Sequence, residues 1–267
     1  MQESYMKKEW KRKMIKIKNV DAFEYIEEIN KNSVDLIILD PNYQDWDSFL
    51  DRGLIEKSME ILKDSGNILC FTKQPFDYNL RVYINKWFRR EIVWTFENGG
   101  AWCSPKMPLI STQKIYWITK TDNFFFNPRT GEDYNGNTKD FKRSIKVFEG
   151  FCEEGHNFIK SEEGTWIRDH LHYNKPNSGN IPAKPEKLIQ IFLRCFCPEN
   201  GTVLDLFSGS GIIPLICNRM NLNCYASELD SERCKNIEIL LANTGAVKNP
   251  KSKELMEQIS IFDYEEN

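Results

Sequence analysis

The sequence predicts an α/β fold in which helices cover both faces of a doubly wound, mostly parallel sheet. Residues 34–39 and 203–206 are short and predominantly apolar, as expected for parallel strands that are buried on both faces. The first run ends at Asp40 and Pro41, and the second is followed by a turn of serines and glycines over residues 208–211. A helical pattern and a short strand follow that turn, which completes the strand-turn-helix-strand unit of a nucleotide-binding sheet.

The periodicity of the apolar residues predicts the remaining elements. Residues 15–22 alternate between apolar and polar, which is typical of a strand, whereas residues 45–63 repeat at helical spacing until Gly66. In chain order, the sequence predicts a strand at 15–22, a helix at 23–29, a strand at 34–39, a helix at 45–63, a strand at 67–72, a helix at 80–88, strands at 91–96 and 114–119, a helix at 188–193, a strand at 203–206, a helix at 212–220, a strand at 224–226 and a helix at 234–242.

Composition limits the class of protein. The chain has 267 residues, 40% hydrophobic and 28% charged, which is ordinary for a globular domain with room for an insertion. No apolar run is long enough to span a membrane and residues 1–14 lack the apolar core of a secretion signal, so we expect a cytoplasmic protein. The net charge of −3 gives no overall attraction to nucleic acid, so such binding needs a local basic surface. We expect the eight cysteines to be reduced and mostly buried, and no metal site is predicted.

The turn after the 203–206 strand has the composition of a cofactor site. Glycines let the backbone approach a ligand closely, and Glu228, which ends the next strand, can bind both hydroxyls of a ribose. A dinucleotide-binding turn needs a third glycine, which is lacking here, and Asp205 stands four residues before Gly209. The pattern from Asp205 to Gly211 instead resembles the first motif of S-adenosylmethionine-dependent methyltransferases, whose cofactor carries positive charges and no phosphate. The resemblance implies cofactor contacts from Asp205, Phe207, Ser208, Gly209, Ser210, Gly211 and Glu228.

The tetrapeptide after the 34–39 strand, Asp40-Pro41-Asn42-Tyr43, resembles the Asp-Pro-Pro-Tyr motif of amino-group DNA methyltransferases. The resemblance implies that the Asp40 carboxylate and the Pro41 carbonyl accept the two N–H groups of a target amine and turn its lone pair toward the methyl donor. It also implies that the base is flipped out of the duplex and stacks on Tyr43. Asn42 stands where a second proline is usual, which reduces the rigidity of the turn. All four residues are predicted to be catalytic, and Asp40 to border the cofactor as well.

The order of the two motifs resembles that of the β group of amino methyltransferases, in which the catalytic motif comes first. In that group an acid near the N-terminus contacts the cofactor adenine, which assigns Asp21, with Ala22 beside it, to the cofactor. Residues 183–185 resemble the last cofactor motif of the family and add Lys184. The family places residues 91–96 and 114–119 as an antiparallel pair that closes the sheet. The polar end of the 67–72 strand adds Thr72, Lys73 and Gln74, which the family places beside the cofactor methionine.

The resemblance divides the chain into a catalytic part, an inserted target-recognition region, a cofactor-binding part and a C-terminal tail, at residues 1–120, 121–181, 182–244 and 245–267. The insertion lacks strong periodicity yet is rich in aromatic residues, which argues against disorder. The basic residues predicted to contact DNA are Lys139, Lys142, Arg143 and Arg168. The alternative is a structural insertion, in which Arg168 pairs with Asp169 or Glu163.

Together the motifs imply a site-specific DNA methyltransferase that transfers a methyl group from S-adenosylmethionine to N6 of a flipped adenine in double-stranded DNA. The first residue of the catalytic motif is more often Asp in adenine enzymes and Ser in cytosine enzymes, so Asp40 favours adenine. Three alternatives stay open: methylation of cytosine N4, a DNA-binding relative that is weakened in catalysis, and methylation of RNA or protein. The family also implies two partners to test for, a cognate restriction endonuclease and a second copy of the chain.

Overall fold

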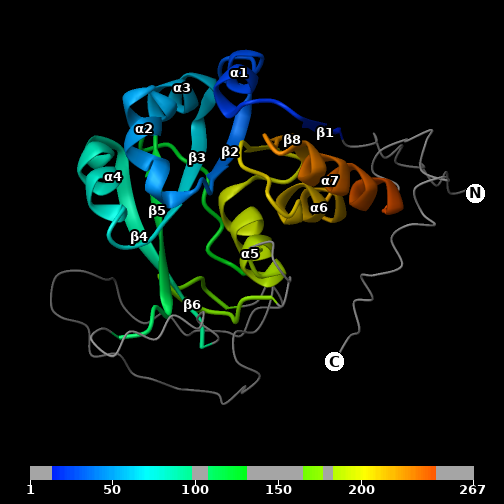
Figure 1. The fold of residues 1–267 in the computed structure, drawn as a ribbon. Coiled ribbons are helices and arrows are strands. Elements are labelled where there is room, and N and C mark those ends of the chain that lie inside the picture. Colours follow the sequence, from blue (N-terminus) through cyan, green and yellow to red (C-terminus); the bar gives the residue numbers. More distant parts are fainter. Residues whose placement is uncertain (1–13, 98–107, 131–164, 177–182, 245–267) are drawn as a thin grey trace, which may run out of the picture.

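The computed structural model describes residues 14–97, 108–130, 165–176 and 183–244. These residues form one mixed sheet with the strand order β1-β8-β7-β2-β3-β5-β4-β6 (Figure 1). No helix in this part of the chain is long and apolar enough to cross a membrane.

The strands are β1 Ile15–Lys18, β2 Val34–Leu39, β3 Leu62–Thr72, β4 Phe88–Thr95, β5 Thr112–Thr119, β6 His170–His172, β7 Thr202–Asp205 and β8 Asn223–Ser227. The helices are α1 Ala22–Glu27, α2 Trp46–Asp51, α3 Leu54–Ile61, α4 Asp77–Tyr83, α5 Glu186–Phe196, α6 Ile212–Arg219 and α7 Ser231–Asn243, with short 3₁₀ turns at Tyr43–Asp45 and Asn85–Trp87.

The two apolar runs form the centre of the sheet. All six residues of β2 are buried, and β2 runs parallel to β7 with Ile38 opposite Asp205. The sheet continues from β7 to β8 and β1 on one side, and from β2 to β3 on the other. Helices α1 to α4 pack together on one face, and α5 to α7 on the other (Figure 1). The chain thus winds outward in two directions from β7 and β2, and ligands of doubly wound sheets bind at the carboxyl ends of strands at such a boundary.

Several predicted elements differ from the structure. The strand expected at 15–22 ends at Lys18, and the helix expected at 80–88 ends at Tyr83, so that Ala22 begins α1 and Phe88 begins β4. The single helix expected at 45–63 is divided into α2 and α3 because Gly53, with φ of 75°, takes a left-handed conformation that ends α2. Leu62, which was expected on the apolar face of that helix, instead begins β3. The predicted antiparallel pair is present as β4 and β5, but β5 lies between β3 and β4 and neither strand ends the sheet.

A strand that the sequence did not predict forms the outer edge of the sheet. β6 lies within the predicted insertion and pairs parallel to β4, with Leu171 opposite Trp94. Of its three residues only Leu171 is buried, and one apolar residue is too short a pattern to indicate a strand. Because β4 and β6 both run parallel to β3, the residues that follow β6 reach the same edge of the sheet as the ends of β2 and β3.

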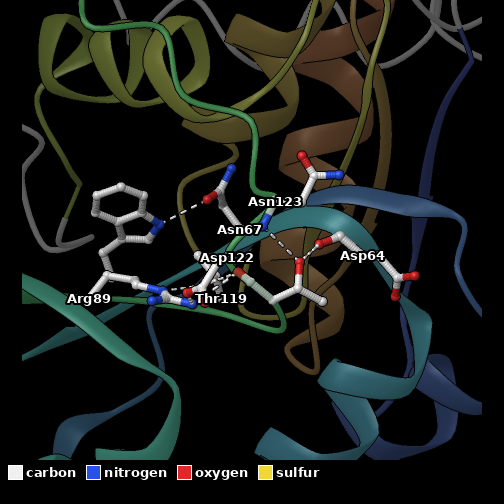
Figure 2. A network of polar contacts seen from close by, with 8 residues as sticks. Asp64, Asn67, Arg89, Thr119, Asp122 and Asn123 are labelled. Carbon is white, nitrogen blue, oxygen red and sulfur yellow. Dashed lines mark hydrogen bonds and ion pairs between the residues drawn. The ribbon is translucent and has the colours of Figure 1, made fainter.

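A buried polar network ties the segment after β5 to β3. Asn67 accepts a hydrogen bond from Trp117 Nε1 at 2.8 Å and donates to the carbonyls of Phe125 and Phe196 at 2.8 and 2.9 Å. Its side chain therefore joins a neighbouring strand, the loop beyond it and the end of α5. The surrounding contacts involve Asp64, Arg89, Thr119, Asp122 and Asn123 (Figure 2).

Replacing Asn67 by leucine is expected to lower the free energy of unfolding by about 3 kcal/mol, because three buried groups lose their hydrogen-bond partner at once. Urea denaturation followed by circular dichroism measures this change. The control is Asn79→Leu, since Asn79 is exposed and its amide donates to the carboxylate of Asp47, another exposed residue. A loss below about 1 kcal/mol would show that the network does not hold the segment in place.

Candidate active site

The glycine turn after β7 has a conformation that few other residues adopt. Gly209 and Gly211 have φ of 51° and 78°. A Cβ atom on Gly211 would lie 2.8 Å from Cγ1 of Ile237, so this glycine lets the turn pack closely against α7. A Cβ atom on Gly209 would meet nothing closer than the Phe207 carbonyl at 3.8 Å. The turn therefore leaves open space for a ligand beside Gly209.

Asp205 places a buried carboxyl group next to this turn. Its Oδ1 accepts a hydrogen bond from the Phe207 N–H at 3.2 Å, and its Oδ2 is buried without a hydrogen-bond partner among the residues that the structure describes. Burial, together with the carboxylates of Asp40 and Glu228, raises the pKa of Asp205 to about 7. A buried carboxylate is costly unless a cation lies beside it. The ammonium and sulfonium groups of S-adenosylmethionine would supply that charge, so Asp205 fits the predicted cofactor.

Glu228 holds the same turn from the end of β8. Its Oε2 accepts the Gly209 N–H at 2.7 Å, and its Oε1 accepts the Asp230 N–H at 3.0 Å. Asn19 fixes this corner by donating to the carbonyls of Glu228 and Leu229 at 2.8 and 2.9 Å. Each carboxylate oxygen of Glu228 retains a lone pair for a ribose hydroxyl, and the Leu229 side chain, 71% exposed, offers an apolar surface to a base. Asn19 and Leu229 were not predicted from the sequence, although they adjoin predicted residues.

The N-terminal residues predicted for the cofactor are connected to the glycine turn by aromatic contacts. Asp21 caps α1, and its Oδ1 accepts the Phe23 N–H at 2.9 Å, while Ala22 is buried at the first position of the helix. The ring of Phe49 lies 5.9 Å from that of Phe23 and 5.3 Å from that of Phe207, measured between centroids. This row of rings joins the start of α1 to the turn that holds Asp205.

The predicted catalytic tetrapeptide follows β2 at the same edge of the sheet. Tyr43 is buried and donates a hydrogen bond from its hydroxyl to Asp40 Oδ1 at 3.0 Å. Burial and the Asp40 carboxylate raise the pKa of Tyr43 well above its usual value, so the phenol keeps this proton. The Lys184 ammonium pairs with Asp40 Oδ2, and Oε1 of Gln113 on β5 lies 3.0 Å from the Tyr43 hydroxyl. The sequence assigns Lys184 to the cofactor, whereas in the structure its described partner is the Asp40 carboxylate.

Asn42 departs from the family motif without changing the shape of the backbone. Its φ is −61°, within the range that a proline ring imposes. The Asn42 carbonyl accepts the Asp45 N–H at 2.9 Å and so begins the 3₁₀ turn that carries Tyr43. Pro41 before it is buried. The backbone at Asn42 is therefore compatible with the proline that the family motif carries at this position.

The predicted cofactor turn and the predicted catalytic tetrapeptide lie at the ends of the neighbouring strands β7 and β2. The sequence model of the DNA methylase family, whose label N6_N4_Mtase names both amino targets, matches residues 8–239. The chain belongs to this family. The resemblance that the two motifs indicate is thereby confirmed for most of the chain.

Individual relatives agree with this assignment. The chain is 24% identical over 245 residues to the type II methyltransferase M1.MboII of Moraxella bovis, covering 81% of this chain and 92% of the relative. It is 24% identical over 236 residues to the type II methyltransferase M.HpaI of Haemophilus parainfluenzae, covering 79% and 69%.

Solved structures confirm the predicted fold class. The M1.HpyAVI complex with S-adenosylmethionine superposes with a TM-score of 0.59 at 20% identity, covering 85% of this chain and 100% of that one. The cytosine-N4-specific PvuII methyltransferase superposes with a TM-score of 0.62 at 14% identity, covering 91% and 90%. The cofactor in the first of these complexes is the one that the glycine turn and Asp205 predict here.

The structure also shows cations around Tyr43, the predicted catalytic tyrosine. Lys73 Nζ lies 5.8 Å and Lys184 Nζ 5.9 Å from the centroid of the Tyr43 ring. The family resemblance places Lys73, at the polar end of β3, beside the cofactor methionine. The sequence did not predict its contact with Tyr43. Thr72, the residue before, is buried, and its hydroxyl has no hydrogen-bond partner among the described residues. Gln113 was not predicted as a site residue, because nothing in the sequence distinguishes it from the other residues of its strand.

Of the residues predicted to contact DNA, the structure tests only the surroundings of Arg168. Arg168 is exposed, and no acid in the described part of the chain pairs with it. Asp169, its expected partner in the structural alternative, instead pairs with Arg90 at 3.1 Å. Glu163 and the other predicted DNA contacts, Lys139, Lys142 and Arg143, lie outside the described residues.

Proposed function

We propose that the chain is a site-specific DNA methyltransferase that transfers the methyl group of S-adenosylmethionine to N6 of an adenine flipped out of double-stranded DNA. The observation that carries this proposal is the adjacency of two different carboxyl groups at the ends of β7 and β2. Asp205 is buried beside the glycine turn and suits a cationic donor. Asp40 is held by Tyr43 and Lys184 and suits a neutral amine. Because their strands are neighbours, donor and acceptor would meet between these groups.

The residues after β2 would prepare the amine for attack. The exocyclic amine of adenine is a poor nucleophile because its lone pair is delocalised into the ring. The Asp40 carboxylate and the Pro41 carbonyl can each accept one of its N–H groups and hold the nitrogen closer to tetrahedral, with the lone pair toward the donor. The donor supplies an electrophilic methyl group; the C–N bond forms as the C–S bond breaks, and the Asp40 carboxylate can accept the proton that the amine then loses. Tyr43 and Lys184 would fix the orientation of that carboxylate.

Cytosine N4 is the second candidate target. The same two acceptors serve its amine, and the PvuII enzyme, whose fold this chain shares, is cytosine-N4-specific. The aspartate at position 40 favours adenine, since the cytosine enzymes of the family more often carry serine there. The deciding experiment incubates the purified chain with S-adenosylmethionine and unmethylated DNA and analyses the digested nucleosides by mass spectrometry. N6-methyladenine supports the proposal, N4-methylcytosine replaces it by the second candidate, and DNA that is bound but unmodified indicates a catalytically weakened relative.

The type II methyltransferases among the relatives support a role beside a restriction endonuclease. Modified-base sequencing of DNA from a host that expresses the chain would give the recognition sequence. Protection of that DNA against a nuclease with the same recognition sequence would support the pairing, and cleavage at methylated sites would contradict it.

Replacing Tyr43 by alanine is expected to lower kcat/KM for DNA more than replacing it by phenylalanine. Phenylalanine keeps a ring on which a base can stack, worth roughly 1–3 kcal/mol, and loses only the hydroxyl contacts to Asp40 and Gln113. Steady-state transfer of a labelled methyl group measures the difference. Tyr78→Ala is the control, because Tyr78 on α4 is 72% exposed. Equal losses in the two Tyr43 variants would mean that the hydroxyl, and not the ring, is what the reaction needs.

A further inference from the structure

Gln113 on β5 contacts the predicted catalytic tetrapeptide from a distant part of the chain. Its Oε1 lies 3.0 Å from the Tyr43 hydroxyl, and the same hydroxyl donates to Asp40 Oδ1 at 3.0 Å. The Lys184 ammonium pairs with the other carboxylate oxygen of Asp40. A chain of polar contacts therefore runs from Gln113 through Tyr43 and Asp40 to Lys184, and it joins three segments that are far apart in the sequence.

The register of β5 explains how Gln113 reaches this place. β5 is antiparallel to β3, so its first residues lie at the edge of the sheet where β3 ends. Side chains alternate along a strand, so Gln113 shares a face with Trp117, whose ring lies 5.0 Å from that of Phe196 on α5. Lys114 points to the opposite face and pairs with Asp77 of α4 at 2.8 Å. Gln113 therefore lies on the α5 side of the sheet, half-buried, with its amide directed at the tetrapeptide.

The number of protons in these contacts decides what the amide does. A phenol has one proton and donates it to one acceptor at a time, whereas Asp40 Oδ1 and Gln113 Oε1 are both acceptors. The charged carboxylate is the stronger acceptor, so it takes the phenol proton. An amide oxygen 3.0 Å from the same hydroxyl would then face a lone pair, with no proton between the two oxygens. A half-turn of the amide exchanges its oxygen and nitrogen in nearly the same space and replaces this repulsion by a hydrogen bond.

We propose that Gln113 is a positioning residue whose Nε2 donates to the Tyr43 hydroxyl oxygen, which commits the phenol proton to Asp40 and holds the carboxylate for the target amine. Without that donor the hydroxyl can rotate about its C–O bond, and Asp40 Oδ1 loses its fixed partner. This inference rests on the proposed function, because it assumes that Asp40 receives an amine. Gln113 acts through Tyr43 and needs no contact with the base or the cofactor.

The first test is a double-mutant cycle between Gln113 and the Tyr43 hydroxyl. Leucine has a similar volume and no hydrogen-bonding group, so Gln113→Leu is expected to lower kcat about tenfold and to leave KM for DNA within about twofold of the wild type. In Tyr43→Phe, which lacks the hydroxyl, the same substitution is expected to change kcat by less than about twofold. Steady-state transfer of a labelled methyl group gives both parameters. An undiminished loss in the Tyr43→Phe background, or no loss in the wild type, would overturn the proposal.

Gln113→Glu tests which end of the amide faces the hydroxyl. An ionised carboxyl group keeps an acceptor there and lacks the donor, so this variant is expected to be less active than Gln113→Leu at pH 8. Wild-type activity at pH 8 would show that the amide oxygen faces Tyr43, and would overturn the proposal. When protonated, the introduced group can donate to the phenol oxygen. Its rate relative to the wild type at the same pH and saturating cofactor is therefore expected to rise as the pH falls to about 5.5.

The charges that face Tyr43 bear on this titration. They are the Asp40 carboxylate and the ammonium groups of Lys73 and Lys184. Lys184 is already paired with Asp40, so burial and the demand for a donor raise the pKa of the introduced group, while Lys73 opposes the shift. A group with a raised pKa stabilises the folded state at low pH and loses that contribution as the pH rises. The melting temperature of Gln113→Glu should therefore lie below that of the wild type at pH 8 and approach it at about pH 5.5.

The matched controls are Gln190→Leu and Gln190→Glu. Gln190 on α5 is also half-buried, and its amide donates to Glu186 Oε1 at 2.8 Å. These variants carry the same changes in volume and charge away from Tyr43, so they should transfer methyl groups at the wild-type rate.

The melting temperatures separate this proposal from the proposed function. If the wild type transfers no methyl group to DNA, the proposed function fails. The melting temperatures of Gln113→Glu at the two pH values then still decide whether Gln113 donates to Tyr43. A wild-type melting temperature at pH 8, or a decrease that is the same at both pH values, would overturn the proposal.

Discussion

Replacing Asp40 by asparagine is expected to lower the rate of methyl transfer by about a thousandfold or more, while cofactor affinity stays within a few-fold of the wild type. The amide removes the negative charge that receives one N–H of the target amine, and it places a donor NH₂ group where one of the two acceptor oxygens stood. Lys184 loses its partner at the same time, so the remaining oxygen is no longer held in one orientation. Single-turnover transfer of a labelled methyl group measures the rate, and calorimetry with S-adenosylmethionine measures the affinity.

The matched control for this change is Asp45→Asn, because Asp45 is an exposed acid only five residues further along the chain. That variant should transfer methyl groups at the wild-type rate. Transfer by Asp40→Asn within about tenfold of the wild type would contradict the two-acceptor mechanism. A loss of cofactor affinity as large as the loss of rate would instead place Asp40 mainly in the cofactor site.

The centre of this fold and both halves of the candidate site could be predicted, because each is marked by a short, continuous sequence pattern. β2 and β7 are buried on both faces and therefore read as short apolar runs, and each run ends in residues whose chemistry is specific. Asp205 and Gly209 lie within one turn of chain, as do Asp40 and Tyr43. Their mutual adjacency comes from the structure, in which β2 pairs with β7 and Ile38 lies opposite Asp205.

Other parts of the site depend on contacts between distant segments, which periodicity does not encode. Tyr43 and Gln113 are 70 positions apart, and Asp40 and Lys184 are 144 apart. The residues after β6 reach the catalytic edge only because β6 pairs with β4, and a strand with one buried residue leaves almost no pattern. A different limit applies at Gly53: the apolar periodicity of residues 45–63 predicts one helix, whereas this glycine ends the first of two.

Replacing Asp205 by asparagine is expected to weaken S-adenosylmethionine binding at pH 8 by roughly 10–100-fold, the value of a charge-assisted hydrogen bond. Asparagine has nearly the same shape, so it can keep the hydrogen bond from the Phe207 N–H and fill the same space. What it lacks is the charge that the buried Oδ2, which has no hydrogen-bond partner among the described residues, would present to the cofactor. Glu199→Gln is the control, because Glu199 is an exposed acid just before β7. Equal affinity of Asp205→Asn and wild type would remove Asp205 from the cofactor site.

The pH dependence of binding tests the same residue in the unmodified protein. Because burial and the carboxylates of Asp40 and Glu228 raise the pKa of Asp205 to about 7, the free protein must release a proton below that pH before a cationic ligand can bind. Wild-type affinity is expected to be constant above pH 7 and to fall about tenfold for each pH unit below it, and Asp205→Asn should lose this dependence. The raised pKa also affects stability. The folded, cofactor-free protein binds this proton more tightly than the unfolded chain does. The contribution of Asp205 to the free energy of unfolding therefore falls as the pH rises from about 4 to about 7. Asp40 and Glu228 carry the other charges that face this carboxyl group. An unchanged pH profile in Asp205→Asn would exclude Asp205 as the group that controls cofactor binding.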